Sequence, residues 1–141
     1  MQVTAKAEYA LRAATVLASS GPGPVKSEAI AAAEGIPLRF LHNILAALTR
    51  AGVLTSLRGA DGGYELTRVP AAITVADVIR AVEGPFAAGG GPEAPAPEST
   101  LRAVWALVRA NERAVLEAVT LADLVAGRLP DRSDMGWPPQ G

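Results

Sequence analysis

The sequence places three side chains that can bond to the edges of DNA bases close together: Arg39, His42 and Asn43. An arginine can donate two hydrogen bonds to guanine, an asparagine can pair with adenine, and a histidine offers one donor or one acceptor. Spacings of three and one residues put all three on one side of a helix. We expect them to contact bases or phosphates; an ordinary solvated helix face is the alternative. We expect no metal site at His42, because no other histidine and no cysteine could join it.

A second candidate contact is the glycine-rich segment 58–63. Arg58 opens it, and its long cationic side chain suits a narrow minor groove, where the negative potential of DNA is concentrated. Gly59 and Gly62 lack side chains, so their backbone can approach a phosphate closely. We expect all three to contact DNA; a generic tight turn is the alternative. Asp61 at the same tip is expected to weaken binding or to face away.

The third candidate group lies nearer the N-terminus. Lys6, Tyr9 and Arg12 follow one another at three-residue steps, as side chains that grip phosphates along a helix would. A core position for Tyr9 is equally compatible with the pattern. Ser27 begins a helix, where its hydroxyl and the free amides suit a phosphate; a plain N-cap is the equal alternative.

The elements that position these residues form a helix-turn-helix. The spacing of apolar residues, together with glycine and proline residues that end helices, predicts three helices over 4–19, 27–34 and 38–51. Thr4 caps the first helix, and Gly35 ends the second. The apolar stripe expected for the third helix comprises Leu38, Phe40, Leu41, Ile44, Leu45 and Leu48. Strands over 53–57 and 64–67 flank the glycine segment and predict a hairpin, the wing. The expected fold is mainly α with a small β-wing: a winged helix-turn-helix domain over 1–84.

The C-terminal half is predicted to mediate dimerisation over 99–127. A helix over 74–84, capped by Thr74, precedes a flexible loop over 85–98, and helices over 100–119 and 120–127 follow. Heptad-like spacing in the longer helix predicts a partner helix. The expected dimer interface consists of Leu101, Trp105, Val108, Val115 and Val119. The tail over 128–141 is expected to be disordered.

Composition narrows the function further. The 141 residues are 50% hydrophobic, enough for a packed core, and contain no cysteine, which excludes disulfides and cysteine-ligated clusters. Residues 1–70 carry a net charge of +2 and the remainder −3, which permits a DNA-binding N-terminal half. No membrane span and no signal peptide are evident, so a cytoplasmic protein is expected. No enzyme motif is present; the glycine loop lacks the Lys-Ser/Thr of a phosphate-binding loop.

Four motifs resemble the Rrf-type family of bacterial regulators, whose members include IscR-, NsrR- and CymR-like winged-helix proteins. The resemblance covers about residues 2–127 in the family's order. The opening motif consists of Val3, Thr4, Lys6, Tyr9, Ala10, Leu11 and Arg12. The recognition-helix motif consists of Ile36 to Leu41, Ile44, Leu45, Leu48 and Ala51 to Leu54. The wing and C-terminal motifs consist of Arg58, Gly59, Gly62, Gly63, Tyr64 and Leu66, then Val78 to Gly84, Thr120, Leu121 and Leu124.

The resemblance implies a homodimeric transcription regulator, in our reading a repressor, bound to a pseudo-palindromic DNA operator. It also implies crossed long helices at the dimer interface and an effector, a small molecule or a protein, of unknown identity. Many members bind an iron–sulfur cluster through three cysteines, which this sequence lacks, so we expect no cofactor. Glu8 matches a non-cysteine ligand of some members, but one carboxylate cannot hold a cluster. The alternative function is a protein-interaction adaptor that has lost DNA binding.

Overall fold

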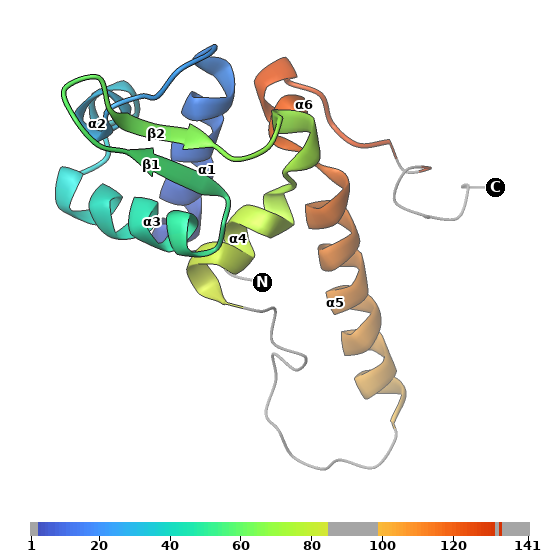
Figure 1. Cartoon of the computed structure of the whole chain (residues 1–141). Coiled ribbons are helices and arrows are strands. Elements are labelled where there is room, and N and C mark those ends of the chain that lie inside the picture. The colour runs from blue at the N-terminus through green and yellow to red at the C-terminus, as the bar shows by residue number, and fades with distance from the viewer. Residues whose placement is uncertain (1–2, 85–98, 132, 134–141) are drawn as a thin grey trace.

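A computed structural model of the chain describes residues 3–84, 99–131 and 133 (Figure 1). The predicted loop over 85–98 and most of the predicted tail lie outside these residues. The elements begin with α1 (Ala5–Ser19), α2 (Ser27–Glu34), α3 (Leu38–Arg50), β1 (Leu54–Leu57) and β2 (Gly63–Leu66). They continue with a 3₁₀ turn η1 (Pro70–Ala72), α4 (Val75–Glu83), α5 (Thr100–Ala118) and α6 (Leu121–Ala126). We refer to residues 3–84 as the head.

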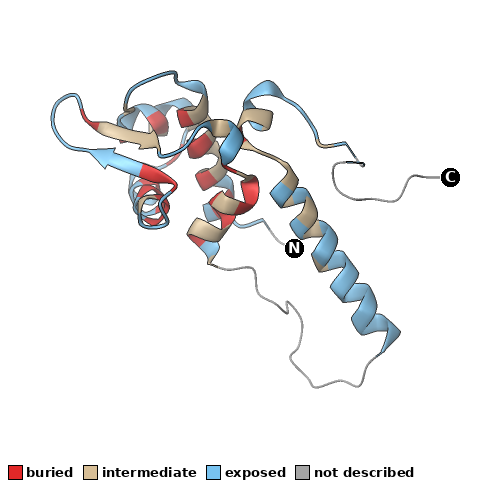
Figure 2. Cartoon of the chain, turned by 45° about the vertical axis from the view of Figure 1, so that its right-hand side comes forward, coloured by how far each residue is buried: buried red, intermediate tan, exposed pale blue. Residues whose placement is uncertain are grey.

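The core lies mainly inside the head, where α1 packs against α2, α3 and α4 (Figure 2). The helix α6, which follows α5, also packs against α1 and adds Leu121 to the core. Alanines of α1 face this core, and their small side chains allow the other helices to approach closely. The predicted residues Leu41, Ile44, Leu45 and Leu48 of α3 are buried at its centre. Gly35 ends α2 in the left-handed conformation expected of it, with φ of 61°. The mainly helical winged helix-turn-helix is therefore confirmed.

One expectation for α3 was wrong, and one alternative for Ser27 is excluded. Leu38 and Phe40 were expected in the buried stripe but are exposed, Phe40 by 61%. Residues 37–40 are all exposed, because the first turn of α3 projects beyond the core, and buried Ile36 fills the apolar position just before it. Ser27 is the first residue of α2 rather than its cap; Lys26 holds the cap position, without a side-chain hydrogen bond.

The wing is a two-stranded antiparallel hairpin over 54–66, in which Leu54 pairs with Leu66 and Leu57 with Gly63. A third segment supports it. Val25 and Tyr64 exchange two backbone hydrogen bonds of 2.9 and 2.8 Å, which fix β2 to the chain before α2. A Cβ on Gly63 would lie 2.5 Å from the Val25 carbonyl oxygen, so only glycine fits there. The base of the wing is thus tied to the helix-turn-helix.

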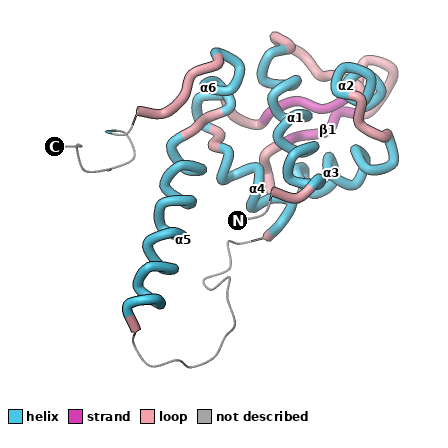
Figure 3. The backbone as a smooth tube through the Cα atoms, turned by 180° about the vertical axis from the view of Figure 1, so that it is seen from behind, coloured by secondary structure: helices cyan, strands magenta, loops and turns pink. Residues whose placement is uncertain are grey.

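The long helix α5 is attached to the head at one end and extends away from it (Figures 1 and 3). The attachment is an antiparallel bridge between Thr74 and Thr120: Val75 N–H donates to the Val119 carbonyl at 2.8 Å, and Leu121 N–H to the Ile73 carbonyl at 2.9 Å. Both threonines also form capping boxes, with Asp77 and Asp123. The start of α4 and the junction of α5 with α6 therefore move together.

Val119, one of the expected dimer residues, has contacts within its own chain. Val119 is half-buried and packs with Leu116 against Ala7, Val75 and Ile79 of its own head. It follows the last turn of α5, where the chain turns back to the head, so it belongs to the intramolecular attachment. None of the residues of α5 is buried. No helix in the described part of the chain is long and apolar enough to cross a membrane.

Candidate nucleic-acid interface

The outer face of α3 carries the three predicted base-reading side chains. Arg39, His42 and Asn43 are all exposed, on the side of the helix away from its buried stripe. The helix begins after Pro37 without a side-chain cap, so its first amide groups also face outward. Positive charge and free donors at the start of an exposed helix suit the phosphates and base edges of a major groove.

The structure brings Ser27 of α2 and His42 of α3 together. The Ser27 hydroxyl lies 3.3 Å from His42 Nε2 and also 3.3 Å from the Glu28 carboxylate. A carboxylate, a serine and a histidine also form the catalytic triad of many hydrolases, but the order of contacts here is different. In a hydrolase the carboxylate orients the histidine ring. Here the carboxylate bonds to the hydroxyl, and Ser27 is only 8% exposed, so its hydroxyl is a poor nucleophile for an incoming substrate. The contact positions His42 on the outer face of α3.

Arg12 and Tyr9 of α1 have contacts within the head. Arg12 Nε donates to the Glu34 carboxylate at 3.0 Å, and Arg12 Nη2 donates to the Glu34 carbonyl at 2.8 Å. The Tyr9 ring packs against the core, with the Arg12 guanidinium carbon 5.9 Å from its centroid. These contacts support the core alternative for Tyr9. Lys6, the third residue of the predicted group, is exposed.

In the wing, Arg58 and Gly59 are exposed at the turn, and so is Asp61. Gly62 differs from them because it is buried and donates its N–H to the Gly59 carbonyl at 3.0 Å. A Cβ on Gly62 would lie 2.1 Å from the Leu57 carbonyl oxygen. Gly62 therefore closes the turn, and of the three predicted wing contacts Arg58 and Gly59 are the exposed ones.

α2, α3 and the wing lie on the side of the head away from α5 (Figure 1). The sequence missed Phe40 as a member of this surface, although Pro37 and Arg39 beside it indicate an exposed first turn. Its ring adds an apolar group to the polar face of α3.

An apolar face runs along α5. Its exposed large side chains include Trp105, which is 54% exposed, and Leu101, Val104, Val108 and Val115. Figure 2 shows that exposure extends along most of the helix. Apolar side chains at this spacing are typical of a helix that packs on a partner helix.

An ion-pair network connects the head with α5. Asp77 accepts from Arg80 at 3.1 Å and lies 3.9 Å from Arg68, and Arg80 also pairs with Glu117 of α5 at 3.2 Å. Burial opposes ionisation of Asp77, but hydrogen bonds from the Thr74 N–H and from Arg80 outweigh it and hold the pKa of Asp77 below its ordinary value. The network reinforces the Thr74–Thr120 bridge.

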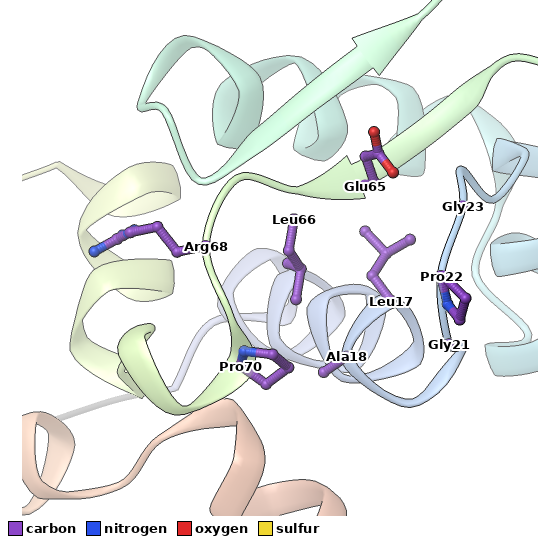
Figure 4. A pocket seen from close by; sticks show the side chains of 9 residues that line it. All are labelled: Leu17, Ala18, Gly21, Pro22, Gly23, Glu65, Leu66, Arg68 and Pro70. Carbon is purple, nitrogen blue, oxygen red and sulfur yellow. The ribbon is translucent and has the colours of Figure 1, made fainter.

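A shallow cavity of about 330 Å³ lies between the end of α1, the following loop, β2 and η1 (Figure 4). Leu17 and Leu66 contribute apolar surface to it. Arg68 bonds to the Ala72 carbonyl of η1 and pairs with Asp77 of α4. Glu65 of β2 also lines the cavity.

Comparison with known proteins points to one family. The Rrf2 family, described as an iron-dependent transcriptional regulator, matches residues 3–127. A protein of Mycobacterium tuberculosis named as an HTH-type transcriptional regulator, Rv1287, is 44% identical over 138 residues, covering 93% of this chain and 85% of that protein. The HTH-type transcriptional regulator CymR of Bacillus subtilis is 35% identical over 127 residues, covering 89% of this chain and 91% of that protein.

Solved structures agree with this result. The structure of CymR, the global cysteine regulator of B. subtilis, is similar with a TM-score of 0.83 at 33% identity, covering 90% of this chain and 98% of that chain. The structure of IscR from T. potens is similar with a TM-score of 0.76 at 32% identity, covering 100% of this chain and 94% of that chain.

The iron in the family's description does not fit the residues of this chain. The sequence has no cysteine and a single histidine. In the ranges 3–84 and 99–131 and at residue 133, no group of three or more histidines or carboxylates could hold a metal ion. Glu8 alone cannot supply the ligands of an iron–sulfur cluster. The match over nearly the whole chain and the shared fold nevertheless show that this protein belongs to the Rrf2 family of winged helix-turn-helix transcriptional regulators.

Proposed function

We propose that the protein is a homodimeric repressor that binds a pseudo-palindromic DNA operator and needs no iron–sulfur cluster. The observation that carries the proposal is the outer face of α3, where Arg39, His42 and Asn43 are exposed together at the start of the helix. In a helix-turn-helix these positions meet base edges when the second helix enters the major groove. The family supplies the regulatory role, and DNA as the target places the protein in the cytoplasm.

The apolar face of α5 supports the dimer. Trp105 and its apolar neighbours would be covered by the same face of a second copy, as in helix pairs with apolar seams. A two-fold dimer presents two copies of α3, which explains why the operator should be pseudo-palindromic. Two wings would then reach the minor grooves beside the two half-sites.

We retain six of the ten predicted contact residues as proposed DNA contacts: Lys6, Arg39, His42, Asn43, Arg58 and Gly59. Each is exposed. The other four have structural tasks in the head. Tyr9 packs on the core, Arg12 binds Glu34, Ser27 contacts His42, and Gly62 closes the wing turn.

Selection of genomic DNA fragments by the purified dimer, followed by a salt titration on the best fragment, tests the proposal. We expect one inverted repeat to be enriched and the logarithm of its affinity to fall steeply with the logarithm of the salt concentration. Arg39→Ala should weaken binding by about 1–3 kcal/mol and relax base preference at one position of each half-site.

A matched control is Arg128→Ala, which removes a cation that pairs with Asp123 at 2.6 Å, near the end of α6. It should leave operator affinity unchanged. Retained dimerisation without any enriched sequence would contradict the proposal and favour the adaptor function. Transcription from the selected promoter, measured with and without the protein, decides between repression and activation.

A further inference from the structure

The contact between Ser27 and His42 determines which nitrogen of the histidine ring carries the proton. The Glu28 carboxylate can only accept hydrogen bonds when ionised. The pKa of Glu28 is lowered, first by a hydrogen bond from its own backbone N–H and further by the Ser27 hydroxyl and the charge of Lys26, and these effects outweigh the opposing effect of desolvation. At neutral pH the carboxylate is therefore ionised, and Ser27 must donate its single hydroxyl proton to it.

The Ser27 oxygen can then only accept from His42. At 3.3 Å the Nε2 atom of the neutral ring must supply the proton of that hydrogen bond, so Nε2 is protonated and Nδ1 is not. Among the residues that the structure describes, no hydrogen-bond donor engages Nδ1, and the side chain is exposed on the outer face of α3. A histidine ring can present either a donor or an acceptor at Nδ1. The contacts with Ser27 and Glu28 leave Nδ1 of His42 as a hydrogen-bond acceptor.

We propose that His42 reads DNA through its unprotonated Nδ1, which selects a base with an exocyclic amino group in the major groove. This inference rests on the proposed function. The amino group is N4 of cytosine or N6 of adenine, the two donors that the major groove presents. Ser27 and Glu28 act as positioning residues: they hold the ring and fix its tautomer but do not touch DNA.

Neighbouring charges are compatible with this assignment. Arg39 lies one turn earlier on α3 and Lys26 at the cap of α2, and Glu28 is the carboxylate of the Glu28–Ser27–His42 series of hydrogen bonds, which we call the relay. Protonation of His42 would make Nδ1 a donor and remove its preference for amino groups.

The DNA experiment starts from the operator that the full-length dimer selects. Each base of a half-site is replaced in turn, and the affinities of the wild type and of His42→Ala are compared. We expect one position at which the wild type prefers cytosine or adenine by about fivefold to tenfold and His42→Ala has no preference. His42→Lys, which can only donate, should reverse the preference toward guanine.

The two possible bases are distinguished by deleting the amino group itself. Cytosine is replaced by 2-pyrimidinone, or adenine by purine, at the identified position. The wild type should lose the same fivefold to tenfold, and His42→Ala should lose nothing. Asn43→Ala is the matched control, because it removes a neighbouring contact of the same face and should leave the preference at the His42 position intact.

A second experiment examines the relay without DNA. The chain has one histidine, so the ¹⁵N resonances of labelled histidine report His42 alone. At pH 8 we expect the tautomer protonated at Nε2 in the wild type, and a smaller fraction of it in Ser27→Ala and Glu28→Gln. Both variants should also weaken the base preference at the His42 position and leave the other positions unchanged.

The outcomes separate this inference from the proposed function. If the dimer selects an operator but His42→Ala and Ser27→Ala leave every base preference unchanged, the inference is overturned and the function stands. A ring protonated at Nδ1 in the free protein would also overturn it. If no operator is selected, the proposed function fails first, and the ¹⁵N spectrum still decides whether the relay exists.

Discussion

Arg12 binds Glu34 through two different atoms of the same residue. Its Nε donates to the Glu34 carboxylate at 3.0 Å, and its Nη2 donates to the Glu34 carbonyl oxygen at 2.8 Å. Glu34 is the last residue of α2, so its carbonyl has no partner within the helix. One guanidinium therefore both joins α1 to α2 and caps the C-terminal end of α2.

Arg12→Ala should lower the free energy of unfolding by about 1 kcal/mol, because both side chains are partly exposed and solvent screens the ion pair. Urea denaturation measures the change. Arg12→Lys should restore little of it, since an ammonium lacks the planar fork of the guanidinium. The slope of the logarithm of operator affinity against the logarithm of salt concentration should stay as in the wild type. A slope smaller in magnitude by about one would show that Arg12 contacts a phosphate instead.

Gly62→Ala should disrupt the wing, because a Cβ there would lie 2.1 Å from the Leu57 carbonyl oxygen. We expect a cost of roughly 1–3 kcal/mol in stability and faster hydrogen exchange at the amides of β1 and β2. Operator affinity should fall with it. Ala60→Gly changes the neighbouring loop without adding an atom and serves as the control. Normal exchange protection in Gly62→Ala would show that the turn tolerates a side chain.

Trp105→Glu should dissociate the proposed dimer. A carboxylate placed in the apolar face of α5 would be buried without a partner on dimerisation, at a cost of about 3 kcal/mol or more. Sedimentation equilibrium measures the dissociation constant. Ala110→Glu introduces the same charge at an exposed position on the opposite side of α5 and should leave the dimer intact. Equal dissociation of both variants, or of neither, would contradict the assigned interface.

Phe40→Ala should change stability by no more than about 0.5 kcal/mol, because the ring is 61% exposed. If α3 enters the major groove as proposed, the ring lies beside the bases and suits the methyl group of a thymine. Replacing that thymine by uracil should weaken wild-type binding about fourfold, the value of one buried methyl group, and should not affect Phe40→Ala. The comparison of the two proteins at each thymine identifies the contact, and uracil substitutions without effect at every thymine would exclude it.

Stability should depend on pH through Asp77. Hydrogen bonds in the folded protein hold the pKa of its carboxyl below the ordinary value, so the unfolded chain binds a proton at higher pH than the folded one. The stabilisation is therefore complete above the ordinary pKa and is lost as the pH falls through it toward the lowered value. Urea denaturation at pH values from 7 to 3 should show that the free energy of unfolding begins to fall at about pH 4. The fall should be smaller in Asp77→Asn. Parallel curves for the two proteins would show that Asp77 does not contribute.

The sequence was sufficient for those elements whose signals are local. The spacing of Leu41, Ile44, Leu45 and Leu48 predicted the buried stripe of α3, and Gly35 predicted the end of α2. The caps Thr4 and Thr74 are also where the sequence predicted them. In each case residues within one or two helical turns determine the structure, so a single chain carries the information.

Contacts between distant residues had no such signal. The bridge between Val25 and Tyr64 joins segments 39 positions apart and depends on how the helices pack. The contact between Ser27 and His42 depends on the angle between α2 and α3, which neither helix encodes alone. Val119 matches the heptad spacing of α5, but the bridge between Thr74 and Thr120 directs it to the head. The DNA-contact residues themselves remain predictions that the proposed experiments test.

The bridge between Thr74 and Thr120 joins the head to one end of α5, so that the two move together. α5 has 19 residues and is therefore about 28 Å long at 1.5 Å per residue. Because the head is fixed to one end of α5, a rotation of α5 by about 5° about its other end would shift the head by about 2.5 Å. Hydrogen bonds to base edges tolerate only a few tenths of an ångström. Small angular changes between two such helices would therefore be enough to take both copies of α3 out of register with successive grooves.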